Sequence, residues 1–153
     1  MATTLIGDPS QFAIEYELLN PWPAFGRVRL WVDGEWFGDI RREMHLYHMA
    51  KMMRWMMLRE PGPMRLVYSS ADHLPADDVL LVEASWSWGD SFDDFLFVLY
   101  AVEAERTVHV LWKLVESSVA DFPGYPPGPH HASVPYTVFD VVVKRYVAAI
   151  ETR

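Results

Sequence analysis

The stretch from Ile6 to Asp39 constrains the fold more than any other part of the chain, because apolar and polar residues alternate in it between proline and glycine breaks. Such alternation is typical of half-buried strands. Asp33-Gly34 joins two of the alternating runs, and this dipeptide is a strong signal for a tight hairpin turn. The sequence therefore predicts a three-stranded meander with strands at Phe12–Leu18, Gly26–Val32 and Glu35–Asp39.

The charges within these strands support one register of the first hairpin. Pairing Glu17 with Arg27 also pairs Glu15 with Arg29, so both cross-strand pairs join opposite charges. The same register sets apolar residues against each other on the other face, with Tyr16 opposite Val28, Ile14 opposite Leu30 and Phe12 opposite Val32. A slip of one residue would move every side chain to the wrong face. The predicted sheet thus has one apolar face and one face with ion pairs.

Composition and charge exclude several classes of protein. Of the 153 residues, 51% are hydrophobic and 22% are charged, which is typical of a folded chain and favours one domain over residues 1–153. The formal net charge of -8 argues against binding to nucleic acid or membrane and favours a basic partner. The sequence has no cysteine, no apolar run of about 18 residues and no recognisable export signal. We therefore expect a cytoplasmic protein without disulfides.

The segment after the meander predicts a helix and then weaker elements. Arg41–Arg59 consists of good helix formers, and Pro61 stops it. Its apolar residues form one stripe at helical spacing, made of Leu46, Met49, Ala50, Met53 and Met57. Two short apolar runs follow, Met64–Tyr68 and Val79–Val82, and periodicity does not decide whether each is a strand or a buried turn.

The C-terminal half predicts a second hairpin and a second helix. The first arm is Phe92–Glu103, and its part Phe95–Val102 is apolar on both faces like a central strand. Its mate, Arg106–Leu114, alternates like a strand nearer an edge. Prolines and glycines make Asp121–Pro135 a long loop, and helical spacing of apolar residues predicts a helix over Tyr136–Glu151. The predicted fold is α+β: a single two-layer domain, with a mostly antiparallel sheet of about five or six strands and two helices packed on one face.

Two pairs of histidines are the candidates for metal binding. His45 and His48 lie three residues apart on the first predicted helix, a spacing that can place two imidazoles on one metal, and His130-His131 are adjacent in the loop. The chain has no cysteine, and no carboxylate is spaced locally to complete either set. We interpret these histidines as structural or solvated, and predict no metal and no cofactor.

The acidic residues Asp90, Asp93 and Asp94 are the candidates for acid–base chemistry. Short acidic runs before a strand are usually solvated, however. The sequence also contains no phosphate loop, no dinucleotide fingerprint and no nucleophile motif. It therefore predicts no catalytic residue.

Aromatic residues outside the apolar stripes are better candidates for binding. The hairpin registers set Trp31 opposite Trp36 on the ion-paired face, and Trp55 lies opposite the apolar stripe of its helix. Aromatic residues rimmed by charge are typical of partner interfaces. The alternative is that the proline-rich loop or a second copy of the protein covers Trp31 and Trp36.

Several motifs resemble those of a known family. They are Ile6 to Glu17, Gly26 to Asp39, Phe92-Asp93-Asp94 and Glu103-Ala104-Glu105-Arg106. In these motifs the chain resembles immunity family forty-two of bacterial polymorphic toxin systems. Arg41–Trp88 is only loosely similar, and the loop from Pro123 to Pro135 looks like an addition.

The resemblance implies a small, non-enzymatic, cytoplasmic protein that binds and neutralises a cognate toxin. It fixes no contact residue, because members of such families face different toxins. From the aromatic and acidic residues we therefore predict the partner-binding set Trp31, Trp36, Trp55, Trp86, Trp88, Asp90 and Tyr125. Two other hypotheses stay open: a small metal-dependent enzyme using His45 and His48, and an oligomeric adaptor whose tryptophan face forms a homodimer.

Overall fold

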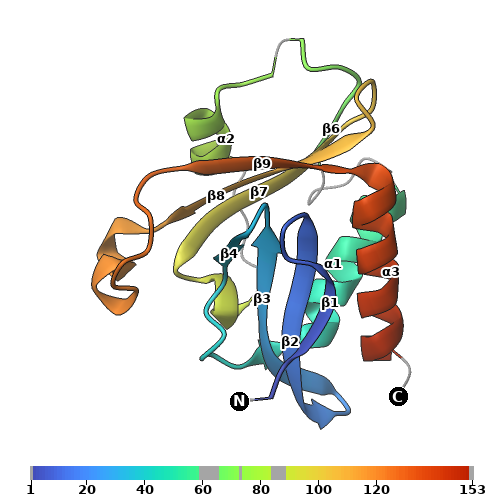
Figure 1. Ribbon diagram of the computed structural model, residues 1–153, viewed down its shortest axis with the longest axis vertical. Helices are drawn as coiled ribbons and strands as arrows, with labels where there is room; N and C mark the ends of the chain where they lie inside the picture. The colour runs from blue at the N-terminus through green and yellow to red at the C-terminus, as the bar shows by residue number, and fades with distance from the viewer. Residues whose placement is uncertain (1, 59–65, 73, 84–88, 152–153) are drawn as a thin grey trace.

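The computed structural model of the protein describes residues 2–58, 66–72, 74–83 and 89–151. Within these residues the strands form two sheets (Figure 1). The first sheet contains β1 (Thr4–Asp8), β2 (Phe12–Pro21), β3 (Ala24–Val32), β4 (Glu35–Phe37) and β5 (Met44–His45). The second contains β6 (Leu66–Tyr68), β7 (Phe95–Val102), β8 (Thr107–Leu114) and β9 (His130–Pro135).

The register predicted for the first hairpin is confirmed. β2 pairs with β3 so that Glu15 faces Arg29 and Glu17 faces Arg27, and the apolar residues face one another on the other side. Asp33 and Gly34 connect β3 to β4 with positive φ angles of 53° and 80°. Positive φ at both central residues is what a type I′ hairpin turn requires, and only glycine adopts it without cost. The hairpin turn predicted at Asp33-Gly34 is therefore confirmed.

The first sheet is larger than the predicted meander. β1 pairs with β2 antiparallel along its whole length, and β5 pairs with β3 beyond the end of β4. β5 also corrects the start of the first helix, because Met44 and His45 are extended and the helix begins at Leu46 rather than near Arg41. Backbone pairing of Met44 with Gly26 holds this segment in the sheet despite its helix propensity.

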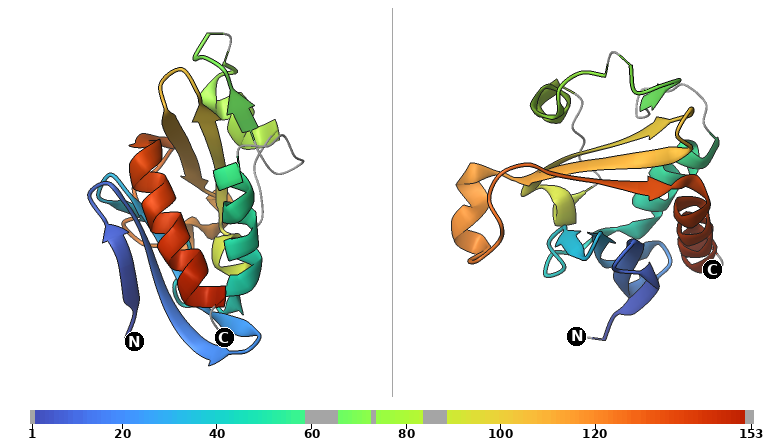
Figure 2. Two further views of the ribbon diagram at one scale, coloured as in Figure 1. Left: turned by 90° about the vertical axis from the view of Figure 1, so that its right-hand side faces the viewer. Right: turned by 45° about the horizontal axis from the view of Figure 1, so that its top comes forward.

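Helices α1 (Leu46–Leu58) and α3 (Tyr136–Glu151) lie side by side against the first sheet (Figure 2). The bounds of α3 are those that helical spacing predicted. Its Phe139 ring lies 5.0 Å from Phe12, and its Tyr146 ring meets Tyr16 edge-on at 5.5 Å, so α3 covers the apolar face of β2. The described part of the predicted α1 stripe is also buried, as Leu46, Met49, Ala50 and Met53.

The second sheet crosses the first, and the main core lies between them. β6 pairs parallel with β7, whereas β7 pairs antiparallel with β8 and β8 with β9. The prediction that β7 is central is confirmed, but β8 is no nearer an edge than β7, because β9 flanks it. Phe37 of β4 joins the sheets: its ring stacks on Trp112 of β8 at 5.3 Å and lies 5.5 Å from Phe97 of β7.

Two segments differ from their predicted structure. Val79–Val82 belongs to helix α2 (Asp77–Glu83), which packs Leu80 and Leu81 on the outer face of the second sheet. Asp77 and Asp78 in the first turn favour the helix, because acidic residues complement the positive end of its dipole. The end of the predicted loop, His130–Pro135, is strand β9, since it finds backbone partners on β8.

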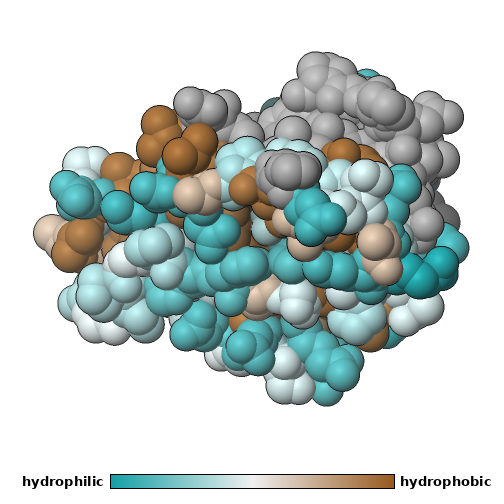
Figure 3. Space-filling model, turned by 90° about the horizontal axis from the view of Figure 1, so that it is seen from above, coloured by the Kyte–Doolittle hydropathy of each residue, from teal (hydrophilic) through white to brown (hydrophobic). Residues whose placement is uncertain are grey.

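The α+β class is confirmed, and two helices do pack on one face of a sheet. The strands are divided between two sheets rather than gathered in one. None of the described helices is long and apolar enough to cross a membrane. Seen from above, the described surface is largely hydrophilic, with smaller apolar areas between (Figure 3).

Candidate functional site

Trp31 and Trp36 face each other across β3 and β4, as predicted, and Arg29 lies against both. The Arg29 guanidinium lies 5.0 Å from the centre of the Trp31 ring and 5.2 Å from that of Trp36, a favourable cation–π geometry. Glu15 accepts hydrogen bonds from Arg29 Nε at 2.7 Å and from Trp31 Nε1 at 2.9 Å. Both rings are half-buried. This face is thus a fixed array of charged and aromatic groups.

The Glu15 carboxylate gives this array a dependence on pH. Partial burial alone would raise its pKa, but hydrogen bonds from Thr3, Trp31 and Arg29 outweigh burial and hold the pKa below its ordinary value of 4.5. A lowered folded-state pKa stabilises the fold fully above the unfolded value, and this contribution is lost as pH falls through the folded value. Glu15 should therefore stabilise the protein at neutral pH and contribute to its acid unfolding.

We expect Glu15→Gln to lower the free energy of unfolding by about 1 kcal/mol at neutral pH. The difference in unfolding free energy between the variant and the unmodified protein should shrink as pH falls below 4.5, because Glu15 of the unmodified protein then becomes protonated and loses its charge. Urea unfolding over this pH range measures it. Glu103→Gln, on an exposed residue, is the control and should change little. If the loss of unfolding free energy caused by Glu15→Gln stayed constant with pH, the stabilising role given to the Glu15 charge would be wrong.

The proline-rich segment covers Trp36. The Tyr125 ring meets the Trp36 ring edge-on at 4.9 Å, and the Phe122 ring lies 6.2 Å away. The Tyr125 hydroxyl donates to the backbone oxygen of Trp36 and accepts from Trp112 Nε1 at 3.0 Å. Burial raises the pKa of Tyr125 above its ordinary value of 10.0, so the hydroxyl keeps its proton. The loop therefore covers part of Trp36, as the alternative predicted, and leaves its side chain half-buried.

We expect Tyr125→Phe to lower the free energy of unfolding by about 1–3 kcal/mol, because it leaves the Trp112 N–H and the Trp36 carbonyl without this partner. Urea unfolding measures the loss. Tyr47→Phe is the matched control, since the Tyr47 side chain is 46% exposed and its hydroxyl can bond to water. Equal effects of the two substitutions would show that the Tyr125 hydroxyl is not a fastening point.

Two further contacts fasten the same segment. Arg41 lies 4.8 Å over the Phe122 ring and donates to the backbone oxygen of Asp121 at 3.2 Å. At the other end, His130 stacks on Trp112 at 5.1 Å and contacts Glu35 Oε2 at 3.2 Å. A pocket of about 570 Å³ lies between this segment and the β3–β4 hairpin, with Arg29 and Trp36 in its lining. We call it the loop pocket.

The predicted acidic group does not act as one cluster. Arg42 Nη1 lies 3.4 Å from Asp94 and its Nη2 lies 4.0 Å from Asp93. Asp94 also accepts from Ser118 Oγ at 2.7 Å, which ties the start of β7 to the segment after β8. Asp90, in contrast, is exposed and lines a separate pocket. Asp93 and Asp94 therefore have structural partners, and Asp90 stays a candidate for contact.

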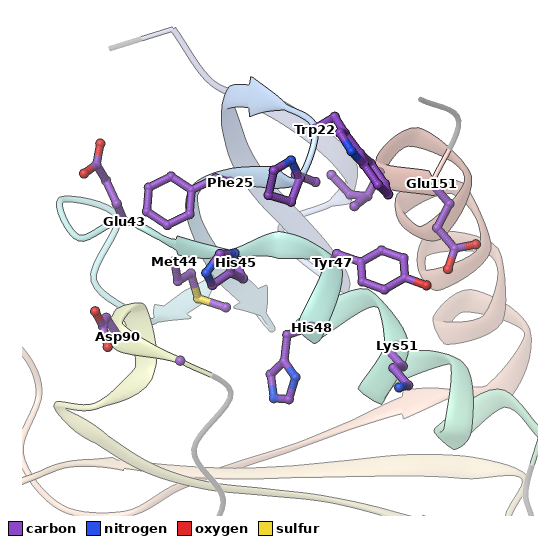
Figure 4. A pocket seen from close by; sticks show the side chains of 14 residues that line it. Trp22, Phe25, Glu43, Met44, His45, Tyr47, His48, Lys51, Asp90 and Glu151 are labelled. Carbon is purple, nitrogen blue, oxygen red and sulfur yellow. The ribbon is translucent and has the colours of Figure 1, made fainter.

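This separate pocket was not predicted. It has a volume of about 600 Å³ and lies beneath Trp22, at the turn between β2 and β3; we call it the Trp22 pocket (Figure 4). Trp22 is 76% exposed. The available signal was its position between Pro21 and Pro23, because a tryptophan at a hairpin turn lies on neither face of the sheet. Strand periodicity therefore does not indicate whether Trp22 is exposed.

His45 and His48 line the Trp22 pocket. The His45 ring meets Phe25 edge-on at 5.2 Å, which gives it a packing role. Among the described residues no three histidine, aspartate or glutamate side chains are grouped to hold a metal ion. The adjacent histidines His130 and His131 have different partners: His130 contacts Glu35, whereas His131 Nδ1 lies 3.3 Å from Asp77.

A comparison with known protein families identifies the family of this chain. A family model described as Immunity protein 42 matches residues 1–146, a range that includes every described strand of both sheets and most of α3. The chain belongs to the Immunity protein 42 family. Membership indicates a toxin-neutralising function, which in such families is typically not enzymatic, and implies a toxin as partner. No curated protein and no solved structure matches the chain.

In this Immunity protein 42 family member, the structure brings together only part of the predicted partner-binding set. Trp31 and Trp36 lie opposite each other on the first sheet, Tyr125 of the proline-rich segment contacts Trp36, and Asp90 lies at the Trp22 pocket. The backbone of Trp55 belongs to α1, but its side chain is outside the described part of the chain. Trp86 and Trp88 also lie outside the described residues.

Proposed function

We propose that the protein is a non-enzymatic immunity protein, which binds a cognate bacterial toxin in the cytoplasm and blocks its activity. The observation that carries this proposal is the match of the Immunity protein 42 family over residues 1–146. Because the match extends over nearly the whole chain, we propose that residues 1–153 form one functional domain.

The charge of the protein supports a basic toxin domain as the partner. The formal net charge is -8, and an acidic protein attracts a basic one over distances of about a Debye length. Such steering raises the rate of association, and aromatic anchors at the centre of the interface then slow dissociation. Neutralisation in this mechanism is steric: the bound immunity protein occupies the active cleft of the toxin or holds the toxin inactive.

The aromatic residues Trp31, Trp36 and Tyr125 are each held by contacts with neighbouring groups. Trp36 and Tyr125 contact each other, and the Tyr125 hydroxyl also accepts a hydrogen bond from Trp112. Trp31 is held by Glu15 and Arg29. A preformed surface binds with less entropic cost than a mobile one, so these residues are suited to offer a rigid contact. We keep Trp31, Trp36, Tyr125 and Asp90 as proposed contacts.

Co-expression tests the proposed function. Immunity genes of this kind normally lie beside the gene for their toxin, so the candidate toxin is the product of the neighbouring gene. Cells that express this toxin in their cytoplasm should survive when they also express the immunity protein. An unrelated toxin that kills by a different activity is the control, and the protein should give no protection against it. The toxin and the protein should also co-purify. Death of the co-expressing cells, together with failure to co-purify, would overturn the proposal.

A further inference from the structure

The Trp22 pocket has the properties of a binding site for one particular chemistry. Its outer wall is Trp22, which is 76% exposed at the β2–β3 turn. Figure 4 shows the Trp22 and Tyr47 side chains on one side of the pocket and Phe25 on the other. Met44, Ala24 and Ile150, all buried, complete an apolar floor. Aromatic rings are thus available on both sides of a hollow of about 600 Å³.

Carboxylates surround this apolar hollow. Glu43 and Asp90 lie at the end near Phe25, and Glu151, at the end of α3, lies at the side of Tyr47 and Trp22 (Figure 4). Glu43 is 47% exposed and lies 3.6 Å from Arg27, so it faces both the sheet and solvent. Lys51 is the one lysine or arginine among the described lining residues, so acidic groups outnumber such cations there by three to one.

We propose that the Trp22 pocket receives an arginine side chain of the toxin, presented beside an apolar residue. This inference rests on the proposed function, and it names the chemistry of the contact. A guanidinium stacks on aromatic faces and pairs with carboxylates, and it is more weakly hydrated than a lysine ammonium. The pocket offers both kinds of partner around one apolar floor. An anionic segment would meet the three carboxylates and be repelled.

Charge also decides between a toxin and a second copy of this chain. A two-fold symmetric dimer brings the same patch of both copies together. At the Trp22 pocket that would set Glu43, Asp90 and Glu151 of one copy near the same residues of the other, and the described lining adds only one lysine, Lys51, from each copy against these six carboxylates. Like charges placed together in an interface are costly. A basic partner is therefore the occupant that the pocket fits.

The first test uses the full-length protein and the toxin encoded beside its gene. We expect Trp22→Ala to weaken binding by about 30-fold, which is the effect of losing one hot-spot residue of about 2 kcal/mol. Val82→Ala is the control, because Val82 is 77% exposed and lies outside this pocket. Circular dichroism should show both variants folded, since both side chains are mostly in solvent. If Trp22→Ala bound the toxin as tightly as Val82→Ala does, the proposal that the Trp22 pocket receives the toxin would be wrong.

The second test concerns charge. The triple variant Glu43→Gln, Asp90→Asn and Glu151→Gln should slow association about 10-fold at low salt, and less at high salt. The matched control removes three carboxylates that do not line the pocket, as Asp72→Asn, Glu103→Gln and Glu116→Gln. Both variants change the net charge equally. If both slow association equally, only the overall charge matters and the pocket carries no specific role.

A third measurement separates failure of the pocket from failure of the proposed function. Acetylated arginine amide should shift the indole N–H resonance of Trp22 in a saturable way, and the citrulline analogue, which lacks the charge, should not. A protein that fails to bind the toxin but shows this shift would overturn the proposed function and keep the arginine site. Equal shifts with both compounds would overturn the site. Dimerisation that Trp22→Ala abolishes would assign the pocket to a second copy instead.

Discussion

Gly26→Ala is expected to lower the free energy of unfolding by about 4 kcal/mol or more, the range reached only when a substitution disrupts the core or backbone. A Cβ at Gly26 would lie 1.9 Å from the backbone oxygen of Glu17 and 3.2 Å from the Cα of Leu18. Both are backbone atoms of the paired strand, so no side chain can rotate to make room. Relief requires β2 and β3 to separate where Glu17 pairs with Arg27.

Gly34→Ala is the matched control for this prediction. Gly34 has a φ of 80°, which an alanine adopts at a cost of about 1 kcal/mol, and nothing lies within 4 Å of the added Cβ. Urea unfolding of both variants measures the difference. A Gly26→Ala variant as stable as Gly34→Ala would show that the close approach of β2 and β3 is not as described.

Phe37→Ala is expected to cost about 3–5 kcal/mol, because it removes the ring that joins the two sheets. Phe37 is fully buried, and its ring stacks on Trp112 at 5.3 Å with 16° between the planes. It also contacts Phe97 at 5.5 Å and Phe92 at 6.0 Å. An alanine would leave a cavity bounded by strands of both sheets. These strands are held by their own backbone pairing, so they cannot move together to fill it.

Phe37→Leu separates the loss of volume from the loss of aromatic contact. It fills most of the space, so its cost should be smaller, about 1.5 kcal/mol. Chemical denaturation followed by far-UV and near-UV circular dichroism measures both variants. The two signals should change together for each variant. If Phe37→Ala cost no more than Phe37→Leu, the Phe37 ring would not be filling the space between the sheets, contrary to the role given to it.

The parts of the fold that could be predicted from the sequence are those set by neighbours in the chain. Glu15 and Glu17 fix the β2–β3 register because only one alignment matches their charges to Arg29 and Arg27. The Asp33-Gly34 turn carries its own conformational requirement. α3 was placed correctly because its apolar period is long enough to outweigh its β-branched residues.

The division into two sheets could not be predicted, because it depends on distant contacts. Phe37 and Trp112 are 75 positions apart by their numbers, and nothing local indicates that their rings stack. The same holds for β6, which pairs parallel with β7 across an intervening helix. Val79–Val82 is too short for its period to distinguish a helix from a strand, and the helix found there is favoured by its acidic neighbours Asp77 and Asp78 rather than by its apolar residues.

The candidate surfaces follow the same division. The opposition of Trp31 and Trp36 could be predicted, because two hairpin registers determine it. That Tyr125 covers Trp36 could not, because the two are separated by 89 positions. The exposure of Trp22 could not be predicted either, because this residue lies at a turn, where strand periodicity gives no information.

Titration of the toxin with this protein, both purified, tests the central claim most directly. The toxin encoded beside this gene should lose its activity in proportion to added protein, and the loss should be complete at equal molar amounts. Denatured protein should have no effect. Full toxin activity in the presence of an excess of folded protein would contradict the assignment of a toxin-neutralising function by direct binding.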